Sequence, residues 1–381
     1  MRNLIGAQNA EQPMQDRRYW LGFNLVRGIG AVRLRALISH FGSAEAAWKA
    51  AAEDLRDAGL GAKTIGRLLA LRADIDVDLL WQRAESQGVR ILTSEDDDYP
   101  PRLREIEQPP PVLFIRGDWR KEDELAVAVV GTRRMTAYGR QITEQLAGHL
   151  AANGITVISG LARGVDEVAH VAALAAGGRT AAVLGSGVDR IYPPENRALA
   201  AKIIASGALL TDYPLGTPPE SSNFPPRNRI ISGLSMATIV VEAGETSGAL
   251  ITAEFAAEQG RDVFAVPGSI LAPQSKGTNK LIQSGALPLL SPDDVLQGLH
   301  LKHAGEHRDA RRILPVDEVE SKVLTVLGSE PLHVDDIRSQ TGLAIERISA
   351  ALVMMELKGM VRQVAGMQYV AVREVQSGYS A

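Results

Sequence analysis

Runs of consecutive apolar residues alternate with amphipathic segments through the middle of this 381-residue chain. Short apolar runs are typical of strands that helices cover on both faces, whereas the segments between them show helical spacing and several end at glycine. We expect strands over residues 89–92, 112–115, 125–130, 156–159, 180–184, 208–211, 237–241 and 262–266. We expect helices over residues 139–152, 166–176, 196–206, 249–259 and 277–285. This alternation predicts an α/β protein with a doubly wound, mostly parallel sheet.

Helical patterns precede this central block. Residues 20–72 contain two turns, Gly28-Ile-Gly30 and Gly59-Leu-Gly61, and a helical segment follows each of them. Such pairs resemble helix-hairpin-helix (SAM-like) units, whose glycine turns can place backbone amides on a phosphate. The alternative is a small helical packing domain with ordinary turn glycines.

A second set of patterns follows the central block. Three helical segments (319–327, 334–340 and 345–357) precede a hairpin (360–364 with 368–372), which predicts a winged helix. Its last helix offers Glu346, Arg347 and Lys358 but little other positive charge, so protein contact is at least as well supported as DNA reading. The expected divisions are a flexible N-terminus (1–18), a helical domain (19–73), a Rossmann-like domain (74–298), a linker (299–314), a winged helix (315–374) and a flexible tail (375–381).

Charge and cysteine content narrow the function classes. The formal net charge of −4 excludes a strongly basic coat, so any nucleic acid must bind a local basic patch. The absence of cysteine excludes disulfides, thiolate nucleophiles and Cys-zinc sites, and it fits a reducing cytoplasm. The first 18 residues lack the apolar region of a signal peptide, and no run approaches the ~20 apolar residues of a membrane span. We therefore expect a cytoplasmic protein without membrane contact.

Three short runs carry the candidate binding chemistry. Gly131-Thr-Arg-Arg134 and Ser159-Gly-Leu-Ala-Arg-Gly164 each follow an expected strand, at the sheet edge where phosphates bind in α/β proteins. The third, Asn223-Phe-Pro-Pro-Arg-Asn-Arg229, is predicted to be a proline-stiffened loop whose phenylalanine could stack on a base or pack in the core. The candidate ligand-binding residues, completed by two from a helix start, are Gly131, Thr132, Arg133, Arg134, Ser159, Gly160, Arg163, Gly164, Asn223, Phe224, Arg227, Asn228, Arg229, Ser247 and Gly248. Arginine and backbone N–H groups suit a polyanion that is held rather than cut.

The sequence gives little support for cofactor, metal or acid–base chemistry. The chain has no Gly-x4-Gly-Lys-Ser/Thr run, and Gly185-Ser-Gly-Val-Asp-Arg190 lacks the third glycine of a dinucleotide fingerprint, so we expect no cofactor. His300, His303 and His307 share helical spacing but lie in a polar segment without further ligands, which favours a solvated face over a metal site. His170 is expected to be a packed core histidine rather than a general base.

Many short runs in fixed order resemble the DNA-processing protein A family, also called the Smf family. They include the three runs above together with Tyr192-Pro193, Val241-Glu-Ala243, Val266-Pro-Gly268 and Gly277-Thr-Asn279. The resemblance implies an N-terminal helical domain, an extended Rossmann-like domain and often a winged-helix tail. It also implies a non-catalytic protein of natural transformation that binds single-stranded DNA, protects incoming strands and helps load the RecA recombinase. Family members work as dimers through the Rossmann-like domain. The matching DNA-pocket positions are Arg133, Ser159 to Gly164 and Asn223 to Arg229, with Ser247 and Gly248 as a weaker extension.

Two rival functions belong to other classes. A similar sheet occurs in phosphoribohydrolases that cleave nucleoside monophosphates, and Glu242-Ala-Gly-Glu-Thr approximates their glutamate signature, so a catalytic carboxylate stays open. A pure adaptor, acting through protein contacts of the winged helix, is the third alternative.

Overall fold

The structure is a computed structural model that describes residues 16–299, 318–327, 331–357 and 361–371. The chain divides into two compact units, residues 1–300 and 301–381. Several predictions lie outside the described residues: most of the expected N-terminus, linker and tail, the three histidines at 300, 303 and 307, and Lys358.

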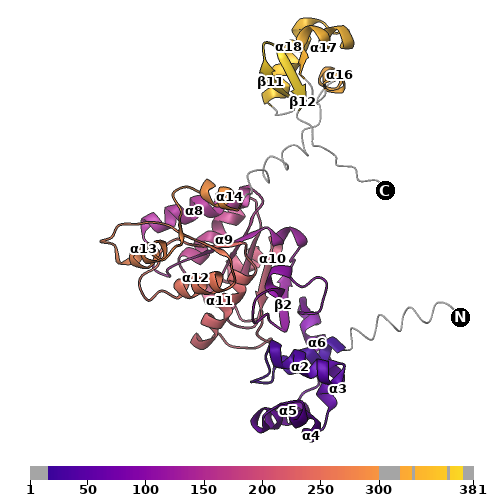
Figure 1. Ribbon diagram of the computed structural model, residues 1–381, viewed down its shortest axis with the longest axis vertical. Helices are drawn as coiled ribbons and strands as arrows, with labels where there is room; N and C mark the ends of the chain where they lie inside the picture. Colours follow the sequence, from indigo (N-terminus) through magenta and orange to yellow (C-terminus); the bar gives the residue numbers. More distant parts are fainter. Residues whose placement is uncertain (1–15, 300–317, 328–330, 358–360, 372–381) are drawn as a thin grey trace, which may run out of the picture. The chain divides into compact units, whose positions relative to one another are not determined.

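A nine-stranded sheet forms the centre of the first unit (Figure 1). Its strand order is β1-β2-β6-β5-β4-β3-β7-β8-β9. All pairs from β6 to β9 along this order are parallel, whereas β1 pairs β2 and β2 pairs β6 antiparallel. The strands are β1 (Val89–Thr93), β2 (Val112–Gly117), β3 (Ala126–Val130), β4 (Thr156–Ser159), β5 (Thr180–Val183), β6 (Ala208–Thr211), β7 (Ala237–Val240), β8 (Asp262–Ala265) and β9 (Leu287–Pro288). The predicted α/β class with a mostly parallel sheet is confirmed.

Helices cover both faces of this sheet because its central strands are apolar on both sides. Ile158 and Val183 pack in one core cluster with Ile230 and Ala253, whereas Ala182 packs on the other face in a different cluster. The helices are α7 (Pro101–Arg104), α8 (Ala137–Ala152), α9 (Val165–Ala175), α10 (Arg197–Ser206), α11 (Phe224–Gly233), α12 (Gly248–Glu258), α13 (Lys276–Gln283) and α14 (Asp293–Gly298). Within this set α8, α9 and α10 pack side by side, and α11 packs against α12.

The third arginine-bearing run is a helix start rather than the loop that we predicted. Asn223 ends a short 3-10 turn (Ser221–Asn223), and α11 begins directly at Phe224. Pro225 and Pro226 fit because the first turn of a helix needs no N–H partners and favours the fixed proline φ. The side chains of Arg227 and Asn228 therefore turn inward against the sheet and are buried.

Short helices build the N-terminal part of this unit. Residues 16–24 are helical, and α2 (Ala31–Phe41), α3 (Ala44–Lys49), α4 (Ala52–Asp57), α5 (Ala62–Asp74) and α6 (Val77–Ser86) follow. Phe23 and Trp48 meet edge to face in their core, with ring centroids 5.2 Å apart. The Asn24 amide connects this region to the sheet by donating to the Asp212 carbonyl at 3.1 Å.

The second unit has the predicted winged-helix arrangement. Helices α16 (Glu318–Val326), α17 (Val334–Thr341) and α18 (Ile345–Leu357) pack around Val323, Ile337 and Leu352. A three-stranded sheet in the order β10-β12-β11 joins Leu332–His333, Gln368–Ala371 and Val361–Ala365. Among the described residues of the whole chain, no helix combines the length and apolar character that crossing a membrane requires.

Candidate functional site

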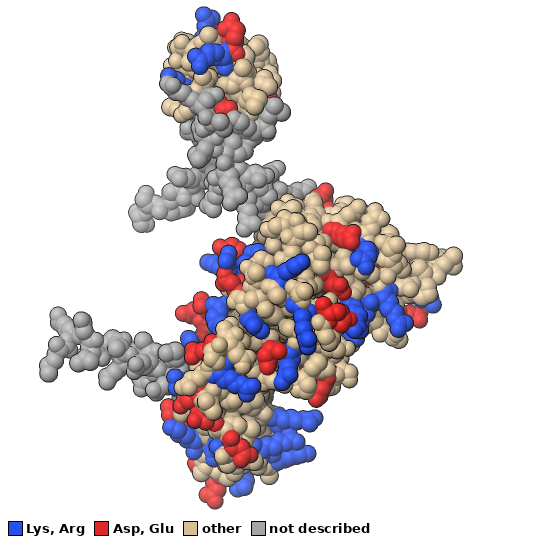
Figure 2. Space-filling view, turned by 180° about the vertical axis from the view of Figure 1, so that it is seen from behind, with Lys and Arg blue, Asp and Glu red and all other residues tan. Residues whose placement is uncertain are grey.

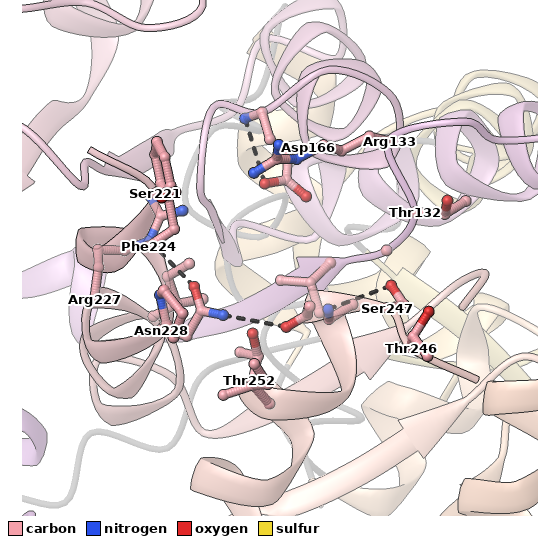
Figure 3. A pocket seen from close by; sticks show the side chains of 18 of the residues that line it. Thr132, Arg133, Asp166, Ser221, Phe224, Arg227, Asn228, Thr246, Ser247 and Thr252 are labelled. Carbon is pink, nitrogen blue, oxygen red and sulfur yellow. Dashed lines mark hydrogen bonds between the residues drawn. The ribbon is translucent and has the colours of Figure 1, made fainter. Parts of the chain in front are cut away.

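A cavity of about 650 Å³ opens where β3 and β7 end (Figure 3). Its walls are the loop between β3 and α8, the start of α11 and the start of α12. This volume lies within the usual range for small-ligand sites. The predicted residues that line it are Gly131, Thr132, Arg133, Arg134, Phe224, Arg227, Asn228, Ser247 and Gly248.

Two guanidinium groups lie near the ring of Phe224 at this cavity. This half-buried ring has the Arg133 guanidinium carbon 5.5 Å and the Arg227 guanidinium carbon 5.8 Å from its centroid. The Tyr192 ring lies 5.8 Å away, tilted by 38°. Cations near an aromatic face interact favourably with its quadrupole. The cavity thus combines a ring suited to stacking with cations suited to phosphate oxygens.

Arg133 and Arg134 provide its accessible positive charge. Both side chains are exposed, and within the described parts of the chain neither has a carboxylate in ion-pair distance. The Arg134 N–H donates to Thr132 Oγ1 at 3.2 Å, which shapes the loop that carries them. No carboxylate of the described residues therefore neutralises their guanidinium groups.

Arg227, which we predicted to contact phosphate, lines the cavity and is held by hydrogen bonds within the protein. Only 5% of it is exposed, and its Nη1 donates to the Gly160 carbonyl at 3.1 Å and to the Val183 carbonyl. Its Nε donates to Asn228 Oδ1 at 3.2 Å. Burial lowers the pKa of this guanidinium to about 10, partly offset by Asp166. Arg227 connects the ends of β4 and β5 to α11 and forms the floor of the cavity.

In the second run, Ala162 lines the cavity, while Ser159 and Gly160 are bonded within the protein. The buried Ser159 hydroxyl donates to the Val129 carbonyl at 2.7 Å, and the Gly160 N–H donates to Asp166 Oδ2 at 3.1 Å. A Cβ on Gly160 would lie 2.7 Å from Arg227 Nη2, and one on Gly164 (φ +83°) would lie 2.4 Å from the Thr132 carbonyl. Both glycines are needed for close packing between loops.

Three further predicted residues lie away from the cavity. Arg163 pairs with Glu195 on the surface, and Arg229 Nη2 pairs with Asp212 at 2.8 Å. Asn223 Nδ2 donates to the Pro218 carbonyl at 3.3 Å. Their charge or donor capacity is used within the protein.

Glu242 fixes the loop that carries the accessible arginines. Its carbonyl accepts from the Thr132 N–H at 2.7 Å, and its buried carboxylate accepts from the Thr136 N–H at 2.8 Å and the Thr136 hydroxyl at 2.6 Å. Glu242 does not line the cavity. The Glu242 carboxylate is therefore hydrogen-bonded to Thr136 and does not lie beside the space that a ligand would fill.

The start of α12 forms the opposite wall. Ser247 caps this helix through its hydroxyl, which accepts from the Ala249 N–H at 3.4 Å, and Asn228 Nδ2 donates to the Gly248 carbonyl at 3.2 Å. The positive end of the helix dipole faces the cavity, which favours an anionic ligand. Residue-by-residue prediction missed the lining residues Tyr192, Ser221, Thr246 and Thr252. Of these, Tyr192 and Thr252 have a signal in the sequence, since Tyr192-Pro193 and Thr252-Ala253 are both among the runs that resemble the family.

Asp166, which lines the cavity, and the fully buried His170 share no hydrogen bond in the described structure. Burial lowers the pKa of His170 to about 3, and its Nδ1 lies 2.6 Å from Thr180 Oγ1. Burial raises the pKa of Asp166, with the Arg227 guanidinium opposing the shift. His170 is thus a neutral core residue, as predicted. Among the described residues, no cluster of three or more histidines and carboxylates could hold a metal.

Together these features define a Rossmann-like α/β protein with a cationic cavity at the carboxyl end of its parallel strands. The family model for DNA recombination-mediator protein A matches residues 90–300, and that for the DprA winged helix domain matches residues 308–367. The chain belongs to the DNA recombination-mediator protein A family, so the resemblance predicted from its motifs is confirmed.

Individual relatives agree with this assignment. Protein Smf of Synechocystis sp. is 38% identical over 93% of this chain and 98% of its own length. DNA processing protein DprA of Bacillus subtilis is 44% identical over 56% of this chain and 72% of its own. The X-ray structure of DNA processing protein A from Streptococcus pneumoniae superposes with a TM-score of 0.65 at 37% identity, covering 74% of this chain and 97% of the other.

One further solved structure concerns ligand binding. It describes the single-stranded DNA binding mode of DNA processing protein A from Helicobacter pylori. The match has a TM-score of 0.51 and 31% identity, and it covers 56% of this chain and 96% of that one.

Proposed function

We propose that this protein binds single-stranded DNA in the cavity beside Phe224. The observation that carries the proposal is the pair of unneutralised guanidinium groups, Arg133 and Arg134, at a cavity that also presents an aromatic ring. Bases stack on aromatic side chains while arginines contact the phosphates, which is how single strands are held without sequence preference. The single-stranded DNA binding mode described for the Helicobacter pylori relative supports the same ligand class.

A salt titration with two forms of DNA tests the proposal. We expect the protein to bind an oligo(dT) tightly at low salt and to bind a blunt duplex of equal length more weakly, because paired bases cannot reach Phe224. Affinity for the single strand should fall by ~0.7 logarithmic units per tenfold rise in salt for each neutralised phosphate. Fluorescence anisotropy at several salt concentrations measures both. Equal affinity for the two forms at every salt concentration would remove the proposed role of the aromatic ring.

The cellular role that we propose is protection of incoming strands during DNA uptake, in the cytoplasm, with help in loading a RecA-type recombinase. Such a role needs binding without turnover, and the engagement of the Glu242 carboxylate with Thr136 supports it. Release of free base from nucleoside monophosphates, abolished by Glu242→Gln, would favour the phosphoribohydrolase alternative instead.

A homodimer through the Rossmann-like domain completes the proposal. Strand β9 lies at the edge of the sheet, and Ile270, Leu271 and Leu290 in this region are 82%, 87% and 78% exposed. Exposed apolar side chains beside an unpaired strand edge favour association with a second copy. We expect Leu271→Asp with Leu290→Asp to shift the mass measured by light scattering from dimer toward monomer. The same variant tests whether recombinase assembly on coated single strands depends on the dimer.

A further inference from the structure

A second group of cations, three exposed and one half-buried, lies in the N-terminal helical region, outside the residues matched by the DNA recombination-mediator family model. Figure 2 shows blue side chains gathered at this end of the first unit and projecting beyond the tan surface. We name the group the N-terminal basic surface and define it as Arg27, Arg33, Lys63 and Arg67. Two segments supply these residues: the turn leading into α2 with the first turn of that helix, and the first half of α5.

Direct contacts place the two segments together. Arg67 Nη1 donates to the Arg27 carbonyl at 3.0 Å, and a Cβ on Gly28 would lie 3.3 Å from Thr64 Oγ1. Arg33 Nη1 donates back to the Gly28 carbonyl at 2.5 Å, which holds its guanidinium beside the same turn. Arg27, Arg33 and Arg67 are thereby held around one turn, and Lys63 directly precedes Thr64.

No ion pair in the described part of the chain neutralises this surface. Within the described residues, none of the four side chains has a carboxylate at ion-pair distance, in contrast to Arg17, Arg18 and Lys49 in the same region. The chain carries no acidic residue between Tyr19 and Ala44 or between Ala58 and Ala73. Like charges without counter-charges repel one another. A bound polyanion would relieve this repulsion, so the patch favours a polyanionic partner.

We propose that the N-terminal basic surface binds the phosphate backbone of DNA, duplex included, without reading its bases. Residues 25–39 and 62–70, which carry the four cations, contain no aromatic residue, and Phe41 at the end of α2 is partly buried against the hydrophobic core. A nucleic acid would therefore meet charge without a ring for stacking, which suits duplex DNA with its charge every ~1.7 Å along the axis. The inference rests on the proposed function only in taking DNA as the polyanion.

The test compares two double variants that remove equal charge. Arg27→Ala with Lys63→Ala removes two cations of the surface whose side chains form no hydrogen bond or ion pair within the described structure. Arg35→Ala with Arg56→Ala is the control, because Arg35 lies on the other flank of α2, roughly 200° around the axis from Arg33. Circular dichroism should give the same melting temperature for both variants and the unmodified chain.

Binding of a blunt 20-base-pair duplex and of a six-nucleotide oligo(dT) supplies the readout. We expect Arg27→Ala/Lys63→Ala to weaken duplex binding about tenfold at 50 mM salt and to reduce the salt slope by about two, with no change for the short oligonucleotide. The control variant should match the unmodified chain. If Arg27→Ala/Lys63→Ala bound the duplex as tightly as the control variant does, the inference would be overturned. The cavity is tested separately, by the loss of oligo(dT) binding expected for Arg133→Ala.

Discussion

Replacing Arg133 by alanine is expected to weaken binding of single-stranded DNA by ten- to a hundredfold while leaving the protein folded. The side chain is exposed at the cavity mouth, faces the Phe224 ring and has no carboxylate partner among the described residues. A charge-assisted hydrogen bond to phosphate contributes about 1.5–3 kcal/mol, and each 1.4 kcal/mol corresponds to a factor of ten. Anisotropy titration with oligo(dT), together with the salt slope, measures the change.

Arg163→Ala is the matched control for this experiment. It removes the same charge from an exposed arginine of the same sheet edge, but Arg163 pairs with Glu195 and does not line the cavity. Its affinity for oligo(dT) should stay within a factor of about two of the unmodified protein, since distant surface charges are screened. If Arg163→Ala lost affinity and Arg133→Ala did not, the ligand would lie on the α9–α10 side, outside the cavity.

Replacing Arg227 by alanine is expected to lower the free energy of unfolding by about 3–5 kcal/mol, because it breaks a buried charged network by removing one partner. The Gly160 and Val183 carbonyls would lose their donor, and Asp166 would lose the compensating charge that faces it. Urea denaturation at pH 7 followed by circular dichroism measures the loss.

Two comparisons isolate the cause. Arg190→Ala removes an exposed arginine with only a loose contact to Asp189 at 3.8 Å, and surface changes of this kind stay within about 0.5 kcal/mol. In the Arg227→Ala background, Asp166→Asn should recover part of the stability because it removes the uncompensated carboxylate. A loss below about 1 kcal/mol in Arg227→Ala would show that the buried guanidinium is not what connects β4, β5 and α11.

The central strands could be predicted because local sequence determines them. Strands β4 and β6 match the predicted bounds, and β3, β5, β7 and β8 differ by one residue at an end, since uninterrupted apolar runs have few alternatives inside a sheet. Helix α6 was missed, although Asp76 caps it and Trp81 and Ala84 lie on its buried face. The proline pair predicts a loop at 223–229 because prolines usually break helices, whereas its actual place in the first turn of α11 depends on where the preceding chain ends.

The roles of the arginines could not be predicted from the sequence. Arg133, Arg163, Arg227 and Arg229 all lie in similar glycine- or proline-rich runs. What separates them are partners distant along the chain: Glu195 for Arg163, Asp212 for Arg229 and the carbonyls of Gly160 and Val183 for Arg227. Burial and pairing of this kind are set by tertiary contacts, which a motif does not encode.

The hydrogen bonds of Glu242 have a consequence for how fast a ligand enters. Because its carbonyl and carboxylate tie both ends of the Thr132–Thr136 loop to the end of β7, the wall that carries Arg133 is preorganised. Binding then needs no ordering of this loop, so the association rate is governed by diffusional encounter and attraction between charges. Differences in affinity among ligands then arise mainly from their dissociation rates.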